Sequence, residues 1–514
     1  MASGDYHLQR IGRFAPYLII GAATLVIILP AILSEPRLHQ SFWIDWVWAD
    51  QFTAEIRKGV IYPRWLPLSH GGLGSPVFYY YPPAAFYLAA FFGMLGLSTY
   101  ATIIAAFAVA IAASGVTMLN WLKGWCRYPL VGALIFMAAP YHVLDFYARG
   151  ALAETLGIAF IPLIALGIRQ AFDLHKYGMA AIAFAGLIMS HLPLAVLAIL
   201  FLIAPYALSL AKRDIRQLAR LAQPFVIGAA LAGIYLVPAL ILDRHRDAGH
   251  LSLLPYLRTE YWSIFSAEWL GLGSFSVLIF ASIASIAVAG MLVWAAGRSV
   301  WAAFAVLVCL ITAGFAPGFW SLPIIEQVQF PFRALPFAEF ALATAIASLP
   351  RLAIALVAIA PAVVIATLAP NYREGAPPLN LLAARHPDVL EYLPPGVSRP
   401  GWTTAWDFVV ADHLPLTTST DDPRAPLFYP SWRVTCGGRQ VETFPDPGTG
   451  QLAPAGANCQ RRIGVTTAER AGQALSLLSL LMLMWLAWRP MPGVRRRSDI
   501  EEGRQTAAIR PARG

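Results

Sequence analysis

The chain of 514 residues is far more apolar than a soluble protein of its length. Hydrophobic residues make up 58% of it, charged residues only 13%, and its mean hydropathy is +0.61, whereas roughly a quarter of a soluble domain is charged. The net charge of +9 does not indicate nucleic-acid binding, because the lysines and arginines fall mainly in short loops between apolar runs. The composition therefore excludes a soluble protein and predicts a polytopic α-helical membrane protein.

Apolar runs close to the ~20 residues that cross a bilayer recur along the chain. The first follows Arg10 and Arg13 and lacks a small-residue cleavage site, so we interpret it as a retained span and not as a signal peptide. We expect twelve spans in all, over residues 14–34, 100–121, 129–147, 151–168, 177–190, 193–210, 222–242, 272–296, 299–316, 334–350, 352–369 and 471–488.

The basic loops between these runs predict the orientation. With the amino terminus inside, every short basic loop falls on the inner side, as the positive-inside rule requires. The residues are Lys123, Arg127, Arg169, Lys176, Lys212, Arg213, Arg216, Arg220, Arg298, Arg351, and Arg495, Arg496 and Arg497 in the tail. The pattern predicts a multi-pass protein of the bacterial inner membrane with both termini in the cytoplasm.

Two stretches were assigned so that the loops alternate correctly. The run 82–97 is short, opens with two prolines and contains two glycines, so we expect a juxtamembrane or re-entrant helix on the outer face. The stretch 177–210 is too long for one span and short for two, and His191 and Pro193 lie at its middle. We therefore predict a hairpin of two short helices with His191 at the outer turn.

Three parts of the chain follow from this topology: a transmembrane domain over 1–369 that includes a first outer loop at 35–99, a periplasmic segment over 370–470, and a last helix with a basic tail over 471–514. The periplasmic segment contains Cys436 and Cys459, a pair that suggests a disulfide in an oxidising compartment. Its stretch "FYPSWRVTCGGRQVETF" alternates as two strands around a Gly-Gly turn. We expect a small β-rich domain there.

Ionisable residues from distant parts of the chain gather on the predicted outer face. They include Asp45 and Asp50 among the tryptophans of "FWIDWVWAD", Arg64, Glu154, His191 and Arg333. His142, Asp145 and Arg149 are spaced to share one face of a helix end. Each also has a plainer interpretation: the tryptophans as interfacial anchors, Asp45 as a solvated loop carboxylate, Arg149 and Glu154 as an ion pair, and His191 as a helix cap. Ionisable groups near the apolar region are costly and tend to be functional.

Several motifs together carry a resemblance to a known family. They are "YPRW" and "GGLGSPVFYYYPP" after the first span, then "YARGALAE", "SHLP" and "FPFRAL". With them, the chain resembles the bacterial membrane family labelled as pyruvoyl-tetrahydropterin-synthase-related. That family is similar in layout to the glycosyltransferase C superfamily, and "YPSWRVTCGGRQV" resembles the β-domain of YfhO-type membrane proteins. The resemblance implies a glycosyltransferase C-like fold.

The resemblance also implies a reaction and its residues. A polyprenyl-phosphate-linked sugar would pass to a periplasmic glycan, lipid or protein acceptor, with Asp45 at the place of the superfamily's first-loop aspartate and Asp50 as a second candidate base. Arg149, Arg333 and Arg64 would bind the donor phosphate. Asp145, Glu154 and His191 would support them, and Tyr80 and Tyr81 would stack on sugar or isoprenoid. Asp45, Asp50 and Glu154 could also hold a divalent cation such as Mg²⁺ or Mn²⁺.

Two other functions remain open at this point. A transporter or flippase for a lipid-linked precursor would carry charges at mid-membrane and broken helices in two similar halves, whereas the predicted spans here are nearly free of such charge and show no clear repeat. The other alternative is a non-catalytic protein of envelope-polysaccharide assembly that binds through its β-domain.

Overall fold

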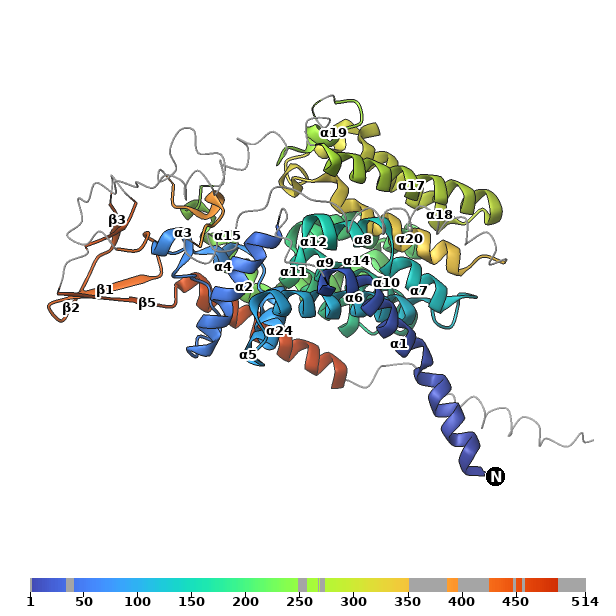
Figure 1. Ribbon diagram of the computed structural model, residues 1–514, viewed down its shortest axis with the longest axis horizontal. Helices are drawn as coiled ribbons and strands as arrows, with labels where there is room; N and C mark the ends of the chain where they lie inside the picture. The colour runs from blue at the N-terminus through green and yellow to red at the C-terminus, as the bar shows by residue number, and fades with distance from the viewer. Residues whose placement is uncertain are drawn as a thin grey trace, which may run out of the picture.

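The computed structural model of the protein describes residues 2–33, 41–247, 257–266, 268, 273–350, 386–395, 425–446, 450–454 and 458–488. The chain is mostly helical, and its few β strands gather at one end of the molecule, with α17 and α18 at the other (Figure 1).

Six helical runs in the described part of the chain are long and apolar enough to cross a membrane. They are Phe14–Leu33 within α1 (Ala2–Leu33), α6 (Thr99–Leu122), Pro129–Arg149, Leu152–Leu174, Leu192–Ala211 and α17 (Ser274–Gly297). A seventh is a bent pair, in which α14 (Ile215–Leu231) and α15 (Gly233–Ile241) meet at 72°. These seven coincide with seven of the twelve predicted spans.

The other five predicted spans have different outcomes. Two are shorter apolar helices, α11 (Gly178–Ser190) and the run Val300–Phe315, made of α18 (Val300–Leu310) and η7 (Ile311–Phe315). The predicted span 334–350 contains α20 (Leu335–Ala347), and the predicted span 471–488 lies within α24 (Thr467–Trp488). The predicted span 352–369 lies outside the described residues.

Short helical pieces build the spans that carry the candidate site. Residues 129–174 form α7 (Pro129–Met137), α8 (Pro140–Leu144), the π-helical turn η1 (Asp145–Arg149), α9 (Leu152–Ile158) and α10 (Ile161–Leu174). Residues 192–211 form α12 (Leu192–Ala198), the π-helical η2 (Ile199–Ile203) and α13 (Ala204–Ala211). The break before α12 falls at His191, whose extended backbone separates α11 from α12.

Gly150 brings the first outer loop against the end of η1. Its φ of +62° lies in the left-handed region, and a Cβ there would come within 2.5 Å of Phe42 Cβ, so both backbone and space favour glycine. Ser41 N also donates to Arg149 O at 2.9 Å. This contact seats the start of α2 (Phe42–Arg57) beside Arg149.

The first outer loop folds as small helices on the bundle: α2, α3 (Ser69–Gly72), α4 (Val77–Tyr80) and α5 (Ala84–Met94). With only 11 residues, α5 is shorter than the ~20 that cross a bilayer. It packs along α2 and α6, in keeping with the prediction of a non-spanning helix at 82–97.

The remaining short elements surround this framework. They are η3 (Asp243–His245), η5 (Thr259–Trp262), α19 (Pro317–Trp320), η8 (Glu326–Val328), η9 (Pro331–Ala334) and η11 (Leu390–Tyr392).

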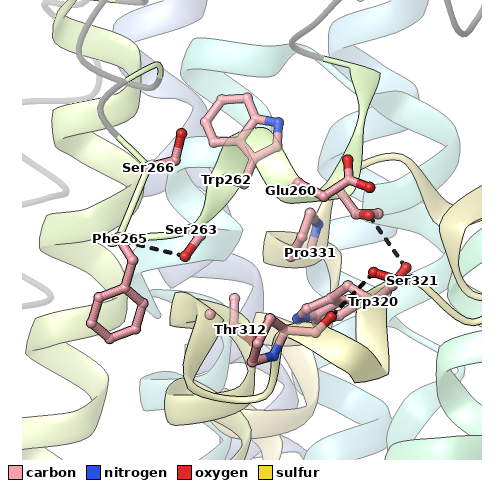
Figure 2. Close-up of a pocket in the computed structure, with 12 residues that line it drawn as sticks. Glu260, Trp262, Ser263, Phe265, Ser266, Thr312, Trp320, Ser321 and Pro331 are labelled. Atoms are coloured by element: carbon pink, nitrogen blue, oxygen red, sulfur yellow. Dashed lines mark hydrogen bonds between the residues drawn. The ribbon is translucent and has the colours of Figure 1, made fainter.

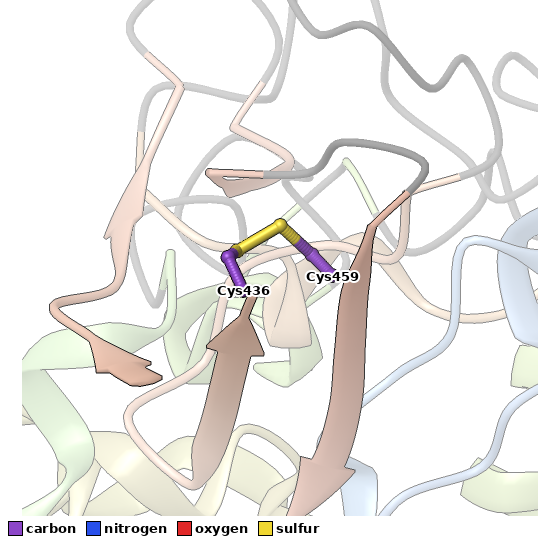
Figure 3. Close-up of a disulfide and its surroundings, with 2 residues drawn as sticks. All are labelled: Cys436 and Cys459. Atoms are coloured by element: carbon purple, nitrogen blue, oxygen red, sulfur yellow. A yellow bond between two sulfur atoms is a disulfide. The ribbon is translucent and has the colours of Figure 1, made fainter. Parts of the chain in front are cut away.

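Two small antiparallel sheets lie beside the first outer loop. One has the order β2-β1-β5 (Arg439–Val441, Trp432–Cys436, Cys459–Ile463), and the other pairs β3 (Phe444–Pro445) with β4 (Leu452–Ala453). Gly437 and Gly438, both with positive φ, make the two-residue turn between β1 and β2. Cys436 and Cys459 face each other across β1 and β5 and form a disulfide (Figure 3).

Aromatic side chains join these sheets to the loop. Tyr429 OH donates to Tyr80 OH at 3.1 Å, and the Trp432 ring packs edge-on against Trp65 at 5.3 Å between centroids. Trp48 Nε1 donates to Asp388 Oδ1 at 2.8 Å. Trp48 and Trp65 are both buried, so for these two the interfacial-anchor interpretation is wrong; they lie in the protein core.

Candidate functional site

Asp45 lies in the first turn of α2 and points toward the start of α9. Its Oδ2 accepts a hydrogen bond from Leu152 N at 3.0 Å, and the residue is 2% exposed. Burial raises the pKa of Asp45 to about 8, although the Leu152 bond and the Arg149 charge oppose the shift. Among the described residues no donor contacts Oδ1, so one oxygen is available.

A buried cluster of charges lies next to Asp45. Arg149 Nη1 is within hydrogen-bond distance of Tyr141 OH (2.6 Å), Asp145 Oδ1 (2.7 Å) and Glu154 Oε2 (2.6 Å). Tyr141 OH in turn donates to Glu154 Oε1 at 2.7 Å. Asp145 and Arg149 are the first and last residues of the π-helical turn η1, a conformation that is frequent at functional sites. Arg149 is only 1% exposed.

Arg333 adds a second cation to the same carboxylate. Its Nε donates to Glu154 Oε2 at 3.2 Å, and its Nη1 donates to Val328 O at 2.6 Å and to Gln329 Oε1 at 3.2 Å. Arg333 is 8% exposed, and no acceptor among the described residues contacts Nη2. Glu154 thus lies between the guanidinium groups of Arg149 and Arg333. Nη2 of Arg333 remains available to a ligand.

His191 completes the surroundings of Glu154. Its Nδ1 accepts from Leu194 N at 3.2 Å, which caps α12, and its Nε2 lies 3.7 Å from Glu154 Oε2. The capping bond requires an unprotonated Nδ1, so the ring proton lies on Nε2, toward Glu154. His191 is therefore both a helix cap and a member of the cluster.

Two phenylalanines separate the cluster from a neighbouring pocket. The Phe332 ring lies 5.2 Å from Arg149 Cζ, and the Phe330 ring lies 4.7 Å from Arg333 Cζ. Trp262 packs edge-on against Phe332 at 4.7 Å between ring centroids and lines the pocket on the other side.

The pocket has a volume of about 280 Å³ and a mostly carbon lining (Figure 2). Its walls come from η5, η7, α19 and η9 and include Thr259, Glu260, Trp262, Ser263, Phe265, Ser266, Thr312, Gly314, Pro317, Trp320, Ser321 and Pro331. Phe265, which lines it, and the neighbouring Phe315, with ring centroids 5.1 Å apart, are exposed. Exposed aromatic side chains therefore lie at one wall of the pocket.

A family model described as "6-pyruvoyl-tetrahydropterin synthase related domain; membrane protein" matches residues 78–372, more than half of the chain. The chain belongs to this family. The matched region contains Arg149, Glu154, His191 and Arg333, whereas Asp45 precedes it.

Comparison with other known proteins adds only a weak structural similarity. No curated protein matches the chain. Among solved structures, arabinofuranosyltransferase AftD from Mycobacteria gives a TM-score of 0.45 at 17% identity, over 69% of this chain and 26% of AftD. A mutant form of AftD gives 0.47 at 19% identity, over 70% of this chain and 28% of that one. This chain thus spans little more than a quarter of AftD.

Of the three tyrosines in the run "FYYYPP", Tyr81 is the one that faces the charge cluster. It lies between α4 and α5 and is half-buried; burial raises the pKa of its hydroxyl, and the Asp45 carboxylate raises it further. No described residue hydrogen-bonds to this hydroxyl, so it is available to a ligand beside Asp45.

Three of the predicted site residues lie elsewhere. Asp50 Oδ1 accepts from Thr99 Oγ1 at 2.8 Å, on another side of α2. Tyr80 OH donates to Leu242 O at 2.8 Å. Arg64 Nε lies 3.0 Å from Glu469 Oε1, and its Nη2 donates to Ile234 O at 2.7 Å. The structure brings together Asp45, Tyr81, Asp145, Arg149, Glu154, His191 and Arg333.

Sequence reasoning missed several buried acids, among them Glu339. Glu339 lies in the middle of α20, pairs with His142 and is 1% exposed. The expectation that the spans are nearly free of charge did not take this residue into account. The signal was present as a single acidic residue in the apolar run "FAEFALATAIA", the kind of residue that is costly in a membrane and rarely incidental.

The carboxylates of the site are already engaged by protein donors. Asp145 and Glu154 accept from Arg149, Tyr141 and Thr155, and Asp45 accepts from Leu152 N. No three acidic, histidine or cysteine side chains converge as metal ligands in the part of the chain that the structure describes. This donor set does not fit a resident divalent cation, and we assign no step to one.

Proposed function

We propose that the protein is a membrane glycosyltransferase that moves a sugar from a polyprenyl-phosphate donor to an envelope acceptor on the periplasmic face. One observation carries the proposal: the free oxygen of Asp45 lies beside a cluster in which two arginines share one glutamate. Sugar transfer from a lipid phosphate needs a base for the acceptor hydroxyl and cations for the departing phosphate. The resemblance of the first outer loop to glycosyltransferase C proteins supports the same reaction class.

The residues take the following roles. The acceptor hydroxyl gives its proton to Asp45 Oδ1 while its oxygen forms the new bond to the sugar's anomeric carbon. The bond from that carbon to the phosphate oxygen breaks, its electron pair leaves with the polyprenyl phosphate, and the anomeric configuration inverts. Arg333 Nη2 binds the leaving phosphate. Arg149, whose Nε has no partner among the described residues, supplies a second positive charge that stabilises the phosphate's negative charge.

The neighbouring pocket suits the donor's hydrocarbon chain. It is lined mostly by carbon and opens beside exposed apolar residues, and one of its lining residues, Pro331, precedes Arg333 by two positions. Its volume of about 280 Å³ is near the lower limit of ~300 Å³ for ligand pockets. This space suits a few isoprene units of a chain that passes the Phe330 and Phe332 rings from a phosphate at Arg333.

The test is the pair of variants Asp45→Asn and Asp50→Asn, assayed for transfer from a panel of undecaprenyl-phosphate-linked pentoses and hexoses. Asparagine at position 45 can still accept from Leu152 N but cannot take a proton, so we expect a loss of about 10²–10⁴-fold in kcat with donor binding retained. Asp50→Asn is the matched control on the same helix and should transfer at the wild-type rate. Normal transfer by Asp45→Asn, with loss in Asp50→Asn, would move the base to Asp50.

A transporter of the same lipid-linked class is the second candidate. The mid-span Glu339 and the broken helices α7–α8, α11–α12 and α14–α15 favour it, because both features are typical of transporters. Translocation of a fluorescent undecaprenyl-phosphate sugar across proteoliposomes, unaffected by Asp45→Asn, would support this function over transfer.

A further inference from the structure

A second carboxylate, Glu339, holds the helix pieces that carry the charge cluster. Its Oε1 accepts from Tyr141 N at 2.6 Å, and its Oε2 lies 3.1 Å from His142 Nδ1. Tyr141 N is in the first turn of α8, where backbone N–H groups have no acceptor within their own helix. One side chain of α20 thus contacts both the Tyr141 backbone N–H and Nδ1 of the His142 imidazole.

The surroundings leave this carboxylate no role at a water-exposed surface. All thirteen residues of α20 are buried, and His142 packs edge-on against Phe136 at 4.6 Å between ring centroids. An unpaired acid in such a place is costly, and a leucine would fill the same space without that cost.

Glu339 connects the two backbone segments that carry Arg149 and Arg333. It follows Arg333 by six residues on the continuous run η9–α20, and Tyr141 precedes Arg149 by eight residues on the run α8–η1. Glu154 joins the two arginines at their tips, whereas Glu339 joins their backbones about two helical turns away. Two attachment points restrain the relative rotation of the two runs more than one point would.

We propose that Glu339 is a positioning residue that holds α8–η1 against η9–α20, so that Arg149 and Arg333 converge on one phosphate. The role of that phosphate rests on the proposed function, whereas the convergence of the arginines is a property of the protein alone. Tyr141 OH, which donates to Glu154, would be placed by the same contact.

Two substitutions of Glu339 distinguish a positioning role from a role in core packing alone. In Glu339→Gln the amide oxygen still accepts from Tyr141 N, and the amide nitrogen donates to His142 Nδ1 once the imidazole proton moves to Nε2. In Glu339→Leu both bonds are lost. The matched control is Thr344→Val, which removes the bond from Trp121 Nε1 to Thr344 Oγ1 (3.1 Å) on the same buried helix.

The first measurement is undecaprenyl-phosphate binding by each variant in nanodiscs, together with its melting temperature. We expect Glu339→Leu to weaken binding at least tenfold and Glu339→Gln to stay within threefold of wild type. Thr344→Val should lower the melting temperature without changing the affinity of the folded protein. Equal affinities for wild type and Glu339→Leu would overturn the proposal.

The second measurement is a cryo-EM structure of Glu339→Leu, which needs no donor. We expect at least one of the two arginines to have left Glu154; finding both in their wild-type places would overturn the positioning role. If wild type binds no undecaprenyl phosphate while the arginines separate in the variant, the proposed function fails and the positioning role stands. Should Glu339→Leu not accumulate, His142→Leu removes one of the two bonds and should weaken binding about three- to tenfold, and unchanged affinity would again count against the proposal.

Discussion

At the scale of single residues, helix geometry distinguishes the two aspartates of the first outer loop. Asp45 and Asp50 are five positions apart, which at ~100° per residue places them about 140° apart around α2. Asp45 therefore faces Leu152 and the charge cluster, whereas Asp50 faces Thr99. Burial then makes Asp45 a weak acid, with a pKa raised to about 8, close to the working pH at which a general base is most effective.

This pKa gives the proposed reaction a definite pH dependence. The base must be ionised, so kcat/KM should rise about tenfold per pH unit up to a pH near 8 and level off above it, because this ratio reports the free enzyme. The measurement is transfer rate at low substrate between pH 5.5 and 9.5. Asp50→Asn should keep the profile, whereas an inflection below pH 5 would exclude Asp45 as the titrating base.

At the scale of elements, the bend between α14 and α15 is stabilised from the last helix. Ile234 N, which follows the break, donates to Ser476 Oγ of α24 at 2.7 Å. A Cβ on Gly472 of α24 would lie 2.4 Å from Gly233 O, so the two backbones touch where both residues lack side chains. Close approach through small residues is a common way for membrane helices to pack.

The substitution Gly472→Ala tests this contact. The added methyl must push α24 away from α15, and we expect a loss of about 1–3 kcal/mol in stability, the usual cost of overpacking. Gly178→Ala is the control, because nothing lies within 4 Å of its Cβ, and it should be neutral or slightly stabilising. Thermal unfolding in detergent measures both, and equal melting temperatures would show that the helices are not in close contact.

Local chemistry explains which elements the sequence predicted. The break at His191 and the Gly437-Gly438 turn were predictable because a capping residue before proline and a Gly-Gly pair act over a few residues. The charge cluster was predicted only as a set of candidates. Its actual partners depend on the π-helical turn at Asp145–Arg149 and on contacts between residues as distant as Glu154 and Arg333, which no local pattern encodes. Glu339 was missed because an apolar window averages out one acid.

At the scale of the whole molecule, the sheets and the first outer loop form a continuous packed unit. Tyr80 stacks on Tyr392 at 5.9 Å between centroids and accepts from Tyr429 OH, and Leu427 N donates to Leu73 O at 2.8 Å. The loop that carries Asp45 is therefore held on one side by the helices and on the other by the sheets.

We expect the disulfide to stabilise this packed unit more than it stabilises the distant helices α17 and α18. Cys436 and Cys459 are 23 residues apart, and closing a loop of that length is worth about 3 kcal/mol on a chain-entropy estimate. We expect the double variant Cys436→Ser/Cys459→Ser to open the β1–β5 pair, which hydrogen exchange would detect there first, while α17–α18 exchange as in wild type. Unchanged exchange in β1 and β5 would contradict this expectation.

The ion pair between Arg64 and Glu469 sets an order of events during synthesis. Glu469 also forms a capping box with Thr466 at the start of α24, so Arg64 gains its partner only when that helix forms. The two residues are about 400 positions apart, which corresponds to roughly 20–80 s of translation. Until then Arg64 lacks its carboxylate partner, and burying a guanidinium without one is costly. We therefore expect the packing around Asp45 to be completed only after α24 has formed.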